Sequence, residues 1–392
     1  MRRRDPHDVA IVGGGVVGAA CALALARQGL DVRLLEAAPP APWSADRADL
    51  RAYAIAPDNV ALLDALDAWA PVRDTRAQAY RRMHVWDAGG GDPIVFDADL
   101  LARPELGWIV EHGLLVEALW RALERAGVRV SCPARVSALE QSDTSATLRL
   151  DDGTSVAARV AIAADGASSP LRQMAGIAAE AHDYAQRGVV GYVRTGRPHE
   201  ATAWQRFLPT GPLALLPWVD GSCSIVWTLP EDEAARVLAL DDDAFGRAIT
   251  TAFDARLGAI DPLGPRAAFP LQRQLSETQH RGRVLVIGDA AHAVHPLAGQ
   301  GVNLGLRDVA ALRDVVAGAR RQRTEWEAPH RLARWARARR SENALAAHAF
   351  EGLNRLFSND ALPATLLRGH LLGLAGRMPP LVDLFWRRAA GG

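Results

Sequence analysis

Three separated stretches of the 392-residue chain place glycines beside a carboxylate, a combination that suits phosphate and hydroxyl groups. In the first stretch, Gly13, Gly15 and Gly18 have Val17 between the last two, and Glu36 ends the next apolar run. Such glycines permit a tight turn and let a pyrophosphate approach backbone amides at a helix N-terminus, where the helix dipole favours negative charge. Glu36 can accept hydrogen bonds from ribose hydroxyls. The stretch predicts a dinucleotide site and leaves FAD and NAD as alternatives.

The second stretch places Ala164, Asp165 and Gly166 directly after an apolar run. A carboxylate cannot hold a phosphate directly, but Asp165 can orient a phosphate-binding loop and accept hydrogen bonds from hydroxyl or backbone donors. Taken alone, the same residues are equally typical of a plain turn at the end of a strand. Both interpretations stay open at this point.

The third stretch begins with Gly288 and Asp289 at the end of an apolar run and continues through Gly299, Gln300 and Gly301. Asp289 can meet a polyol hydroxyl, and the later glycines bring backbone N–H groups to the start of a helix. The positive end of that helix can stabilise an anion, and the glycines let a flat ring lie against the main chain. Helical spacing predicts a buried face made of Val302, Leu306, Val309, Leu312 and Val316.

The elements that must position these stretches follow from the apolar pattern. Strands are expected over Val9–Val12 and Val32–Leu35 with a helix between them, which makes a βαβ unit of a parallel sheet. Helices are expected over about 62–69, closed by Pro71, and over 114–125. Antiparallel strands are expected over 80–99 and around turns at 152–153 and 220–221. The mixture predicts an α/β fold whose domains are discontinuous in sequence, and whose separated strand ends converge on one site.

Composition excludes several classes of function. Net charge is +0, pI is about 7.2, and all 45 basic residues are arginine, so no overall field favours nucleic acid. Cys21, Cys132 and Cys223 form no C-x-x-C pair, which fits a reducing compartment and argues against a disulfide frame or zinc site. His292 and His295 lack a carboxylate ligand pattern, so packing or hydrogen bonding is expected in place of a metal site.

No segment approaches the roughly 18 apolar residues that a membrane span requires. The basic N-terminus also reaches charged and glycine residues before an apolar region long enough for export. We therefore expect a cytoplasmic protein, with contact to the inner face of a membrane only at its periphery.

The three stretches, in this order, resemble those of the flavin-dependent aromatic hydroxylases with the para-hydroxybenzoate hydroxylase fold. The most specific part is "GDAAHAVHPLAGQGVNLGLRD", from Gly288 to Asp308. Other segments are similar to the ubiquinone-biosynthesis branch, especially hydroxylases of an octaprenyl-methyl-methoxy-benzoquinol; they include "DLRAYAIAPDNVALLDALDAW", "LGWIVEHGLLVEALWRAL" and "WQRFLPTGPLALLPWVDGSCSIVW". Many relatives carry an Asn-Arg pair where His112 and Gly113 stand, so a flavin contact from that arginine is not carried over.

The resemblance implies a set of FAD contacts. Glu36 would bind the adenosine ribose, Arg51 the phosphate or ribityl region, Val136 the adenine through its backbone, and Asp289 the ribityl chain. Pro296 and the residues from Gly299 to Asn303 would line the isoalloxazine ring. The full expected set is Gly13, Gly15, Val17, Gly18, Glu36, Arg51, Val136, Asp165, Gly166, Asp289, Pro296, Gly299, Gln300, Gly301, Val302 and Asn303.

The same resemblance implies a division of the chain. A Rossmann-like FAD-binding domain is expected in the segments 1–72, 106–178 and 276–340. An antiparallel-sheet substrate domain is expected in 73–105 and 179–275, and a C-terminal helical tail in 341–392. For that tail, contact with a membrane or a multienzyme assembly and packing on the body of the protein or on a partner subunit are alternatives. No oligomeric state is predicted.

The implied activity is that of an FAD-dependent monooxygenase in ubiquinone biosynthesis. FAD would be held without a covalent bond, NAD(P)H would dock transiently as reductant, and O2 would be the co-substrate. A flavin C4a-hydroperoxide would then hydroxylate the electron-rich ring of a polyprenylated phenol or benzoquinol. Two rival functions are a flavin-dependent reductase of isoprenoid chains and a flavin-binding assembly factor without turnover.

No proton-abstracting residue can be assigned from the sequence. His182, Tyr184 and Tyr192 lie near the expected entrance to the substrate domain, and each is expected to be structural. Apolar side chains of the predicted hairpin are expected in the core of the substrate domain; they are Leu213, Leu215, Leu216, Trp218 and Trp227.

Overall fold

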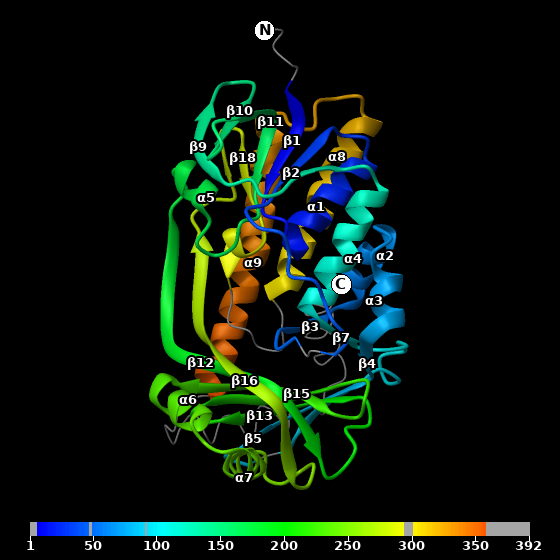
Figure 1. Cartoon of the computed structure of the whole chain (residues 1–392), viewed down its shortest axis with the longest axis vertical. Coiled ribbons are helices and arrows are strands. Elements are labelled where there is room, and N and C mark those ends of the chain that lie inside the picture. Colours follow the sequence, from blue (N-terminus) through cyan, green and yellow to red (C-terminus); the bar gives the residue numbers. More distant parts are fainter. Residues whose placement is uncertain (1–5, 47–48, 91, 294–300, 358–392) are drawn as a thin grey trace.

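The computed structural model describes residues 6–46, 49–90, 92–293 and 301–357, with side chains through residue 345. Figure 1 shows an elongated molecule with a sheet at each end. Two long strands, β12 (Ala179–Thr195) and β16 (Ile260–Ser276), run side by side from one end to the other. The expected α/β fold is confirmed.

The first sheet has the strand order β17-β18-β11-β1-β2-β8, with β10 and β9 added at its side. Strand β1 pairs in parallel with both β2 and β11, and β11 pairs in parallel with β18. The bounds are β1 His7–Val12, β2 Val32–Leu35, β8 Arg129–Ser131, β9 Val136–Gln141, β10 Ala146–Leu150, β11 Ser155–Ala163, β17 His280–Arg281 and β18 Val284–Val286. The βαβ unit expected at the N-terminus is therefore confirmed.

Helix α1 (Val16–Arg27) lies at the centre of the core that covers this sheet. Its buried residues are four alanines, Val16, Gly18, Cys21 and two leucines. Because most of these side chains are small, α4 (His112–Arg125) and α8 (Gly301–Arg321) can pack closely against it. The face predicted for α8 is buried as expected, since Leu306, Leu312 and Val316 are fully enclosed. This packing fixes the direction in which the N-termini of α1 and α8 point.

The second sheet has the order β19-β16-β12-β15-β14-β13-β5-β6, and α6 (Glu231–Leu238) and α7 (Asp242–Ala252) pack against it. Its other bounds are β5 Arg82–Asp87, β6 Ile94–Asp97, β13 Thr202–Leu208, β14 Gly211–Pro217, β15 Cys223–Pro230 and β19 His292–Ala293. The predicted hairpin is confirmed: β14 and β15 pair across a turn at Gly221, whose φ is +83°. Its five named apolar side chains are all buried, as expected.

A three-stranded sheet of β3 (Ala52–Ile55), β7 (Gly107–Glu111) and β4 (Ala77–Tyr80) lies between the two larger sheets. The helix expected over 62–69 is wrong in its bounds: α2 spans Pro57–Ala65 and α3 spans Trp69–Arg76. Pro71 therefore does not close a helix but lies in the first turn of α3. Proline is tolerated there because N–H groups of the first turn have no partner within the helix.

The remaining elements are α5 (Pro170–Met174), the short 3-10 helix η1 (Gly288–Ala290) and α9 (Pro329–Phe357). Because α9 is continuous, the boundary expected at residues 340 and 341 falls inside a helix. The assignment of the other segments to an FAD-binding and a substrate domain stays a prediction. Within the described part of the chain, no helix is both long and apolar enough to cross a bilayer.

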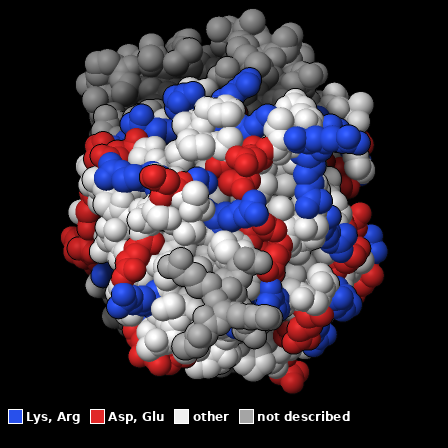
Figure 2. Space-filling model, turned by 90° about the horizontal axis from the view of Figure 1, so that it is seen from above, with Lys and Arg blue, Asp and Glu red and all other residues white. Residues whose placement is uncertain are grey.

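Acidic and basic side chains are mixed on the face that carries the end of the first sheet. Figure 2 shows red and blue groups side by side over the described part of this face. Ion pairs among the described residues of the first sheet are exposed, such as Arg129 with Asp31 and Arg149 with Glu140. Exposed pairs of this kind contribute little to stability, so they mainly keep the surface polar.

Candidate functional site

The three glycine–carboxylate stretches meet at the carboxyl ends of neighbouring parallel strands. Ala164 N donates to Val12 O at 2.8 Å, and Ile287 N donates to Ala163 O at 3.0 Å. The ends of β1, β11 and β18 therefore lie side by side, as the sequence predicted. Ligands of parallel α/β sheets bind at this edge, so it is the place to look for a nucleotide.

The glycines of the first stretch have two different roles. A Cβ on Gly13 would lie 2.3 Å from Ala164 O, and one on Gly18 would lie 1.9 Å from Gly13 O, so both glycines are required by packing. A Cβ on Gly15 would meet no atom of the described residues within 4 Å. Gly15 is also the residue before α1, and no side chain caps that helix. An open space thus faces the uncapped N-terminus of α1, which suits a phosphate.

Glu36 lies beside this turn. Its Oε2 accepts a hydrogen bond from Gly14 N and its Oε1 accepts one from Ala38 N at 3.0 Å. Trp120 of α4 donates from Nε1 to Gly14 O at 2.7 Å, a contact that the sequence analysis missed. On the other side, Ala134 N donates to Glu36 O at 2.7 Å, which brings the start of β9 at Val136 close to Glu36.

The carboxylate of the second stretch has hydrogen-bond partners that are close to it in sequence. Asp165 accepts hydrogen bonds from the Ser169 hydroxyl and from Leu171 N, and so fixes the start of α5. Burial raises the pKa of Asp165. Asp165 was expected either to accept hydrogen bonds from hydroxyl or backbone donors or to lie in a plain turn at the end of a strand. Both features are present. Gly166 has φ +84°, and a Cβ there would meet nothing within 4 Å.

Arg172 joins the second stretch to the third. Its guanidinium is buried, and Nη1 donates to Ala167 O at 3.0 Å and to Ala290 O at 2.8 Å. Sequence reasoning missed this residue because arginines are frequent throughout the chain and nothing in its local pattern distinguishes it. The contact holds the loop after β11 against η1, and so holds Asp289 beside the other strand ends.

Close packing also joins the first stretch to the third. A Cβ on Gly305 would lie 2.6 Å from Val17 Cγ2 and 3.1 Å from Gly288 Cα. Helix α8 can therefore approach α1 and η1 only because residue 305 has no side chain. Val17, which was expected to contact the cofactor, contributes here through packing.

Asp289 and the start of α8 border one open space. The Asp289 side chain is accessible to solvent although the surrounding protein raises its pKa. A Cβ on Gly301 would lie 4.0 Å from Asp289 Oδ1 and would meet no other group of the described residues within 4 Å. Asp289 therefore faces the N-terminus of α8 across a gap that glycine leaves open.

The other residues expected around the isoalloxazine have different positions. Val302 is buried in the main core. The side chain of Asn303 is buried and hydrogen-bonded to Ala54 O, Ala56 N and Asn59, so it holds β3 and α2 and does not face the open space. Pro296, Gly299 and Gln300 lie outside the described residues.

A loop before β3 is held by two carboxylates. Glu111 is completely buried; it accepts hydrogen bonds from Trp43 Nε1 at 2.7 Å and Asp49 N at 3.2 Å. Asp49 in turn accepts from Arg51 N at 2.9 Å and Gly113 N at 2.7 Å. The guanidinium of Arg51 is exposed and has no hydrogen-bond or ion-pair partner among the described residues, so it is available to an anion.

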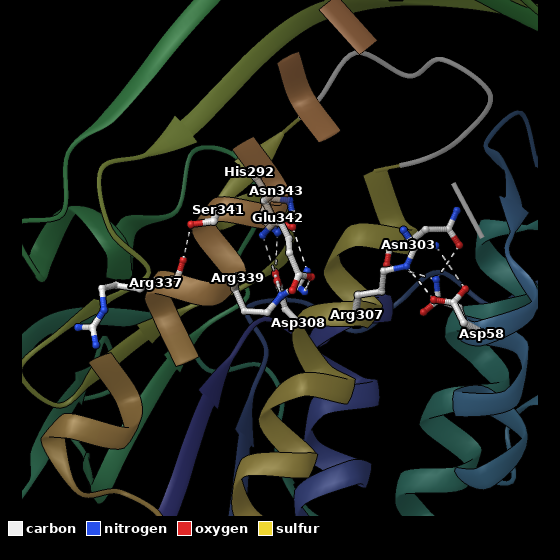
Figure 3. A network of polar contacts seen from close by, with 11 residues as sticks. Asp58, His292, Asn303, Arg307, Asp308, Arg337, Arg339, Ser341, Glu342 and Asn343 are labelled. Carbon is white, nitrogen blue, oxygen red and sulfur yellow. Dashed lines mark hydrogen bonds and ion pairs between the residues drawn. The ribbon is translucent and has the colours of Figure 1, made fainter. Parts of the chain in front are cut away.

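Beneath η1, a buried ion network supports the site (Figure 3). Asp308 Oδ2 accepts from Gly288 N at 3.1 Å and from His292 Nε2 at 2.6 Å. Its Oδ1 accepts from Arg339 Nε at 2.8 Å and Asn343 Nδ2 at 3.1 Å. His292 and Arg339 keep the pKa of Asp308 low, at about 2, although burial opposes them. His292 thus has the local hydrogen bond that was expected for it; His295 lies outside the described residues.

The three candidates for proton abstraction differ in their surroundings. Tyr192 is buried, donates its hydroxyl hydrogen bond to Asp49 O at 2.9 Å, and packs on Trp218. These contacts fit the structural role expected for it. His182 and Tyr184 lie on β12 with their rings 5.0 Å apart. No residue can be assigned as the base, and the described residues contain no group of three or more metal-ligating side chains.

The residues present fit FAD. The space beside Gly15 faces an uncapped helix, the one beside Gly301 faces Asp289, and Glu36 lies at the end of β2. These are the positions at which a pyrophosphate, a ribityl chain and an adenosine ribose would meet a parallel sheet. Residues Gly13, Gly18 and Gly305 are needed to bring these groups together.

The fold and this site define an FAD-dependent monooxygenase. Residues 6–343 match the family described as FAD binding domain. The structure superposes on p-nitrophenol 4-monooxygenase PnpA of Pseudomonas putida DLL-E4 with a TM-score of 0.78, covering 98% of each chain at 19% identity. It also superposes on Klebsiella pneumoniae HpxO, complexed with FAD and uric acid, with a TM-score of 0.75 at 20% identity over 98% of each chain.

Two sequence relatives are closer. The 3-demethoxyubiquinol 3-hydroxylase of Escherichia coli (strain K12) is 40% identical over 375 residues, 94% of each chain. The human mitochondrial ubiquinone biosynthesis monooxygenase COQ6 is 33% identical over 430 residues, covering 96% of this chain and 91% of the relative. The chain belongs to the FAD-binding-domain family, in the branch that holds these ubiquinone hydroxylases.

Proposed function

We propose that the protein hydroxylates the aromatic ring of a polyprenylated phenol or benzoquinol in ubiquinone biosynthesis, with NAD(P)H as reductant and O2 as co-substrate. The observation that carries the proposal is the convergence of Gly15, Glu36 and Asp289 at one sheet edge, in a chain that is 40% identical to a ubiquinol hydroxylase. No second Gly-x-Gly-x-x-Gly turn follows a strand, so the reductant is proposed to dock transiently.

The chain's own groups would bind and orient the cofactor. The amides at the start of α1 would hold the pyrophosphate, Glu36 the adenosine ribose, Arg51 a phosphate or ribityl oxygen, and Asp289 the ribityl chain. The dipole of α8 would stabilise negative charge on the reduced ring, because its N-terminus faces the space beside Asp289. Bound FAD would supply the electron transfer and oxygen activation, which no side chain can provide.

The test is turnover by purified protein. The FAD-loaded enzyme should oxidise NAD(P)H and consume O2 only in the presence of a prenylated quinol precursor, and mass spectrometry should find one added oxygen on the ring. A strain that lacks the protein should accumulate the precursor, whose structure names the ring position. A colourless protein that refuses added FAD contradicts the proposal.

The same measurements separate the two rival functions. A reductase of isoprenoid chains would add hydrogen to the prenyl chain without consuming O2. An assembly factor without turnover would bind FAD and show neither reaction.

We further propose that the enzyme meets its lipophilic substrate at a membrane surface or in a multienzyme assembly. The support is chemical, because a polyprenyl chain partitions into a bilayer. Flotation with vesicles that contain a prenylated quinol should carry the protein upward. A protein that stays at the bottom of the gradient in the presence of these vesicles would contradict contact with a membrane.

A further inference from the structure

A polar cavity lies beside the 3-10 helix η1. Its volume is about 490 Å³, within the roughly 300–1,000 Å³ that is usual for small-molecule sites. The adjoining ends of β12 and β16, the strand β19 and one face of α9 enclose it. No described residue of the set expected to contact FAD lines this cavity, so it is a different space from the one that Asp289 faces.

Two buried side chains in the cavity wall have a polar atom without a hydrogen bond. His292 is 1% exposed, and its Nδ1 has no partner among the described residues. Gln279 is 2% exposed; its Nε2 donates to Val286 O at 3.2 Å, but its Oε1 has no partner in the same part of the chain. Buried polar atoms are nearly always hydrogen-bonded. Two exceptions in one wall therefore indicate that their partners come from a molecule in the cavity.

The hydrogen bond between His292 and Asp308 limits what this molecule can be (Figure 3). Although burial opposes them, His292 and Arg339 hold the pKa of Asp308 at about 2, so its carboxylate only accepts hydrogen bonds and His292 Nε2 carries a proton. Nδ1 then accepts a hydrogen bond when the ring is neutral and donates one when the ring is charged. Gln279 Oε1 can only accept. Hydroxyl groups suit both atoms, because a hydroxyl both donates and accepts.

The charges in the cavity wall favour an anion. Arg273 forms an ion pair with Glu180 at 3.5 Å, and Glu277 forms one with Arg281. The Glu180 side chain is also 81% exposed, so water screens its charge. Arg340 lines the cavity from α9, and neither a hydrogen bond nor an ion pair of its guanidinium is found within the described ranges. A phosphate is the group that best suits a guanidinium in this position.

We propose that this cavity binds a phosphorylated ribose, with the phosphate at Arg340 and ribose hydroxyls at Gln279 Oε1 and His292 Nδ1. An inorganic anion would leave the two buried atoms without partners, and an uncharged sugar would not use Arg340. The same chemical group occurs in free nucleotides and in nicotinamide nucleotides. The second source rests on the proposed function, which requires a nicotinamide nucleotide as reductant.

The test is calorimetric titration with AMP in a phosphate-free buffer, with FAD bound so that the nucleotide cannot enter the FAD site. AMP and ribose 5-phosphate should both bind. Inorganic phosphate and adenosine should each bind at least about tenfold more weakly, because each lacks one of the two kinds of contact.

Arg340→Gln should weaken AMP binding about tenfold, through loss of a charge-assisted hydrogen bond, and should leave the weak binding of adenosine unchanged. Arg337→Gln is the matched control, because Arg337 is exposed on the same helix and does not line the cavity. It removes the same charge and should stay within about twofold of the wild type. In a protein that refuses FAD, which contradicts the proposed function, the contrast between these two variants still tests the cavity.

Absence of AMP binding to the wild type, equal losses in Arg340→Gln and Arg337→Gln, or phosphate that binds as tightly as AMP would overturn the proposal. A second measurement needs no variant: in the 1H–15N spectrum of the labelled protein, the His292 Nδ1 signal should move when AMP is added. A signal that AMP does not move would overturn the contact. Competition separates the two sources, since NADH should displace AMP if the ligand is a nicotinamide nucleotide, and AMP that stays bound in excess NADH assigns the cavity to a free nucleotide.

Discussion

His292 Nε2 lies 2.6 Å from Asp308 Oδ2, and both side chains are buried beneath the loop that presents Asp289. The same carboxylate accepts a hydrogen bond from Gly288 N, the residue before Asp289. Asp308 thus connects α8, whose N-terminus faces the site, with η1 and with Arg339 of α9. One buried charge holds three elements that are far apart in sequence.

Replacing this charge should weaken both the fold and the site. Asp308→Asn leaves the buried Arg339 with only the exposed Glu342 as counter-ion, and it offers an amide N–H to groups that are already donors. We expect a loss of roughly 3–5 kcal/mol in the free energy of unfolding and poorer retention of FAD. Urea unfolding measures the first effect and flavin absorbance the second. Asp314→Asn, an exposed residue on the same helix, is the control and should cost under about 0.5 kcal/mol. An unchanged midpoint for Asp308→Asn would contradict the role given to the network.

Asp289 should matter for cofactor binding and little for folding. Its side chain is accessible, and no hydrogen bond of it is found among the described residues, so Asp289→Ala removes no structural contact. We expect FAD affinity to fall by about tenfold or more, since a charge-assisted hydrogen bond to the ligand is lost. Thermal unfolding of the apoprotein should stay near that of the wild type. If the purified variant keeps its yellow colour and full turnover, the placement of the ribityl chain is wrong.

Gly15 and Gly13 give a contrast within a single turn. A side chain on Gly15 meets open space, so Gly15→Val should fold normally but block the approach of the pyrophosphate and lower FAD content severely. Gly13→Val should instead prevent folding, because its Cβ would collide with Ala164 O and its φ is +104°. Circular dichroism together with flavin content separates the two outcomes. Normal FAD content in Gly15→Val would contradict the binding of the pyrophosphate at this turn.

His112 should make stability fall in weak acid. Its pKa is about 4 in the folded protein against about 6.5 when unfolded. Between these values the unfolded chain binds more protons, so stability falls as pH drops from 6.5 to 4 and this contribution is constant below that. The full effect is about 3 kcal/mol. The difference in stability between wild type and His112→Gln should change only within this pH window, and a difference that is the same at every pH would contradict the neutral state.

Local sequence patterns sufficed to predict the centre of the site. Glycines that follow an apolar run mark the end of a strand, and parallel strands end at one edge, so the convergence of Gly13, Asp165 and Asp289 could be predicted without a structure. Trp120 and Arg172 could not, because their partners Gly14 and Ala290 lie over a hundred residues away and depend on how helices pack. The contacts of Asn303 could not be predicted for the same reason, because its side chain points into the core, toward Ala54 and Asn59.

The strands β12 and β16 have a mechanical consequence. They pair from Ala179 with Ser276 to Thr195 with Ile260, and the ladder is interrupted only between Asp183 and Gln186 and between Val190 and Tyr192. In a hydrogen-bonded two-stranded ribbon, sliding of one strand past the other breaks hydrogen bonds, whereas bending keeps them. The ribbon between the two large sheets should therefore bend more easily than its strands slide. We therefore expect any change in the separation of the two large sheets to be a bend at these two interruptions, the first of which contains Ala185 with φ +50°.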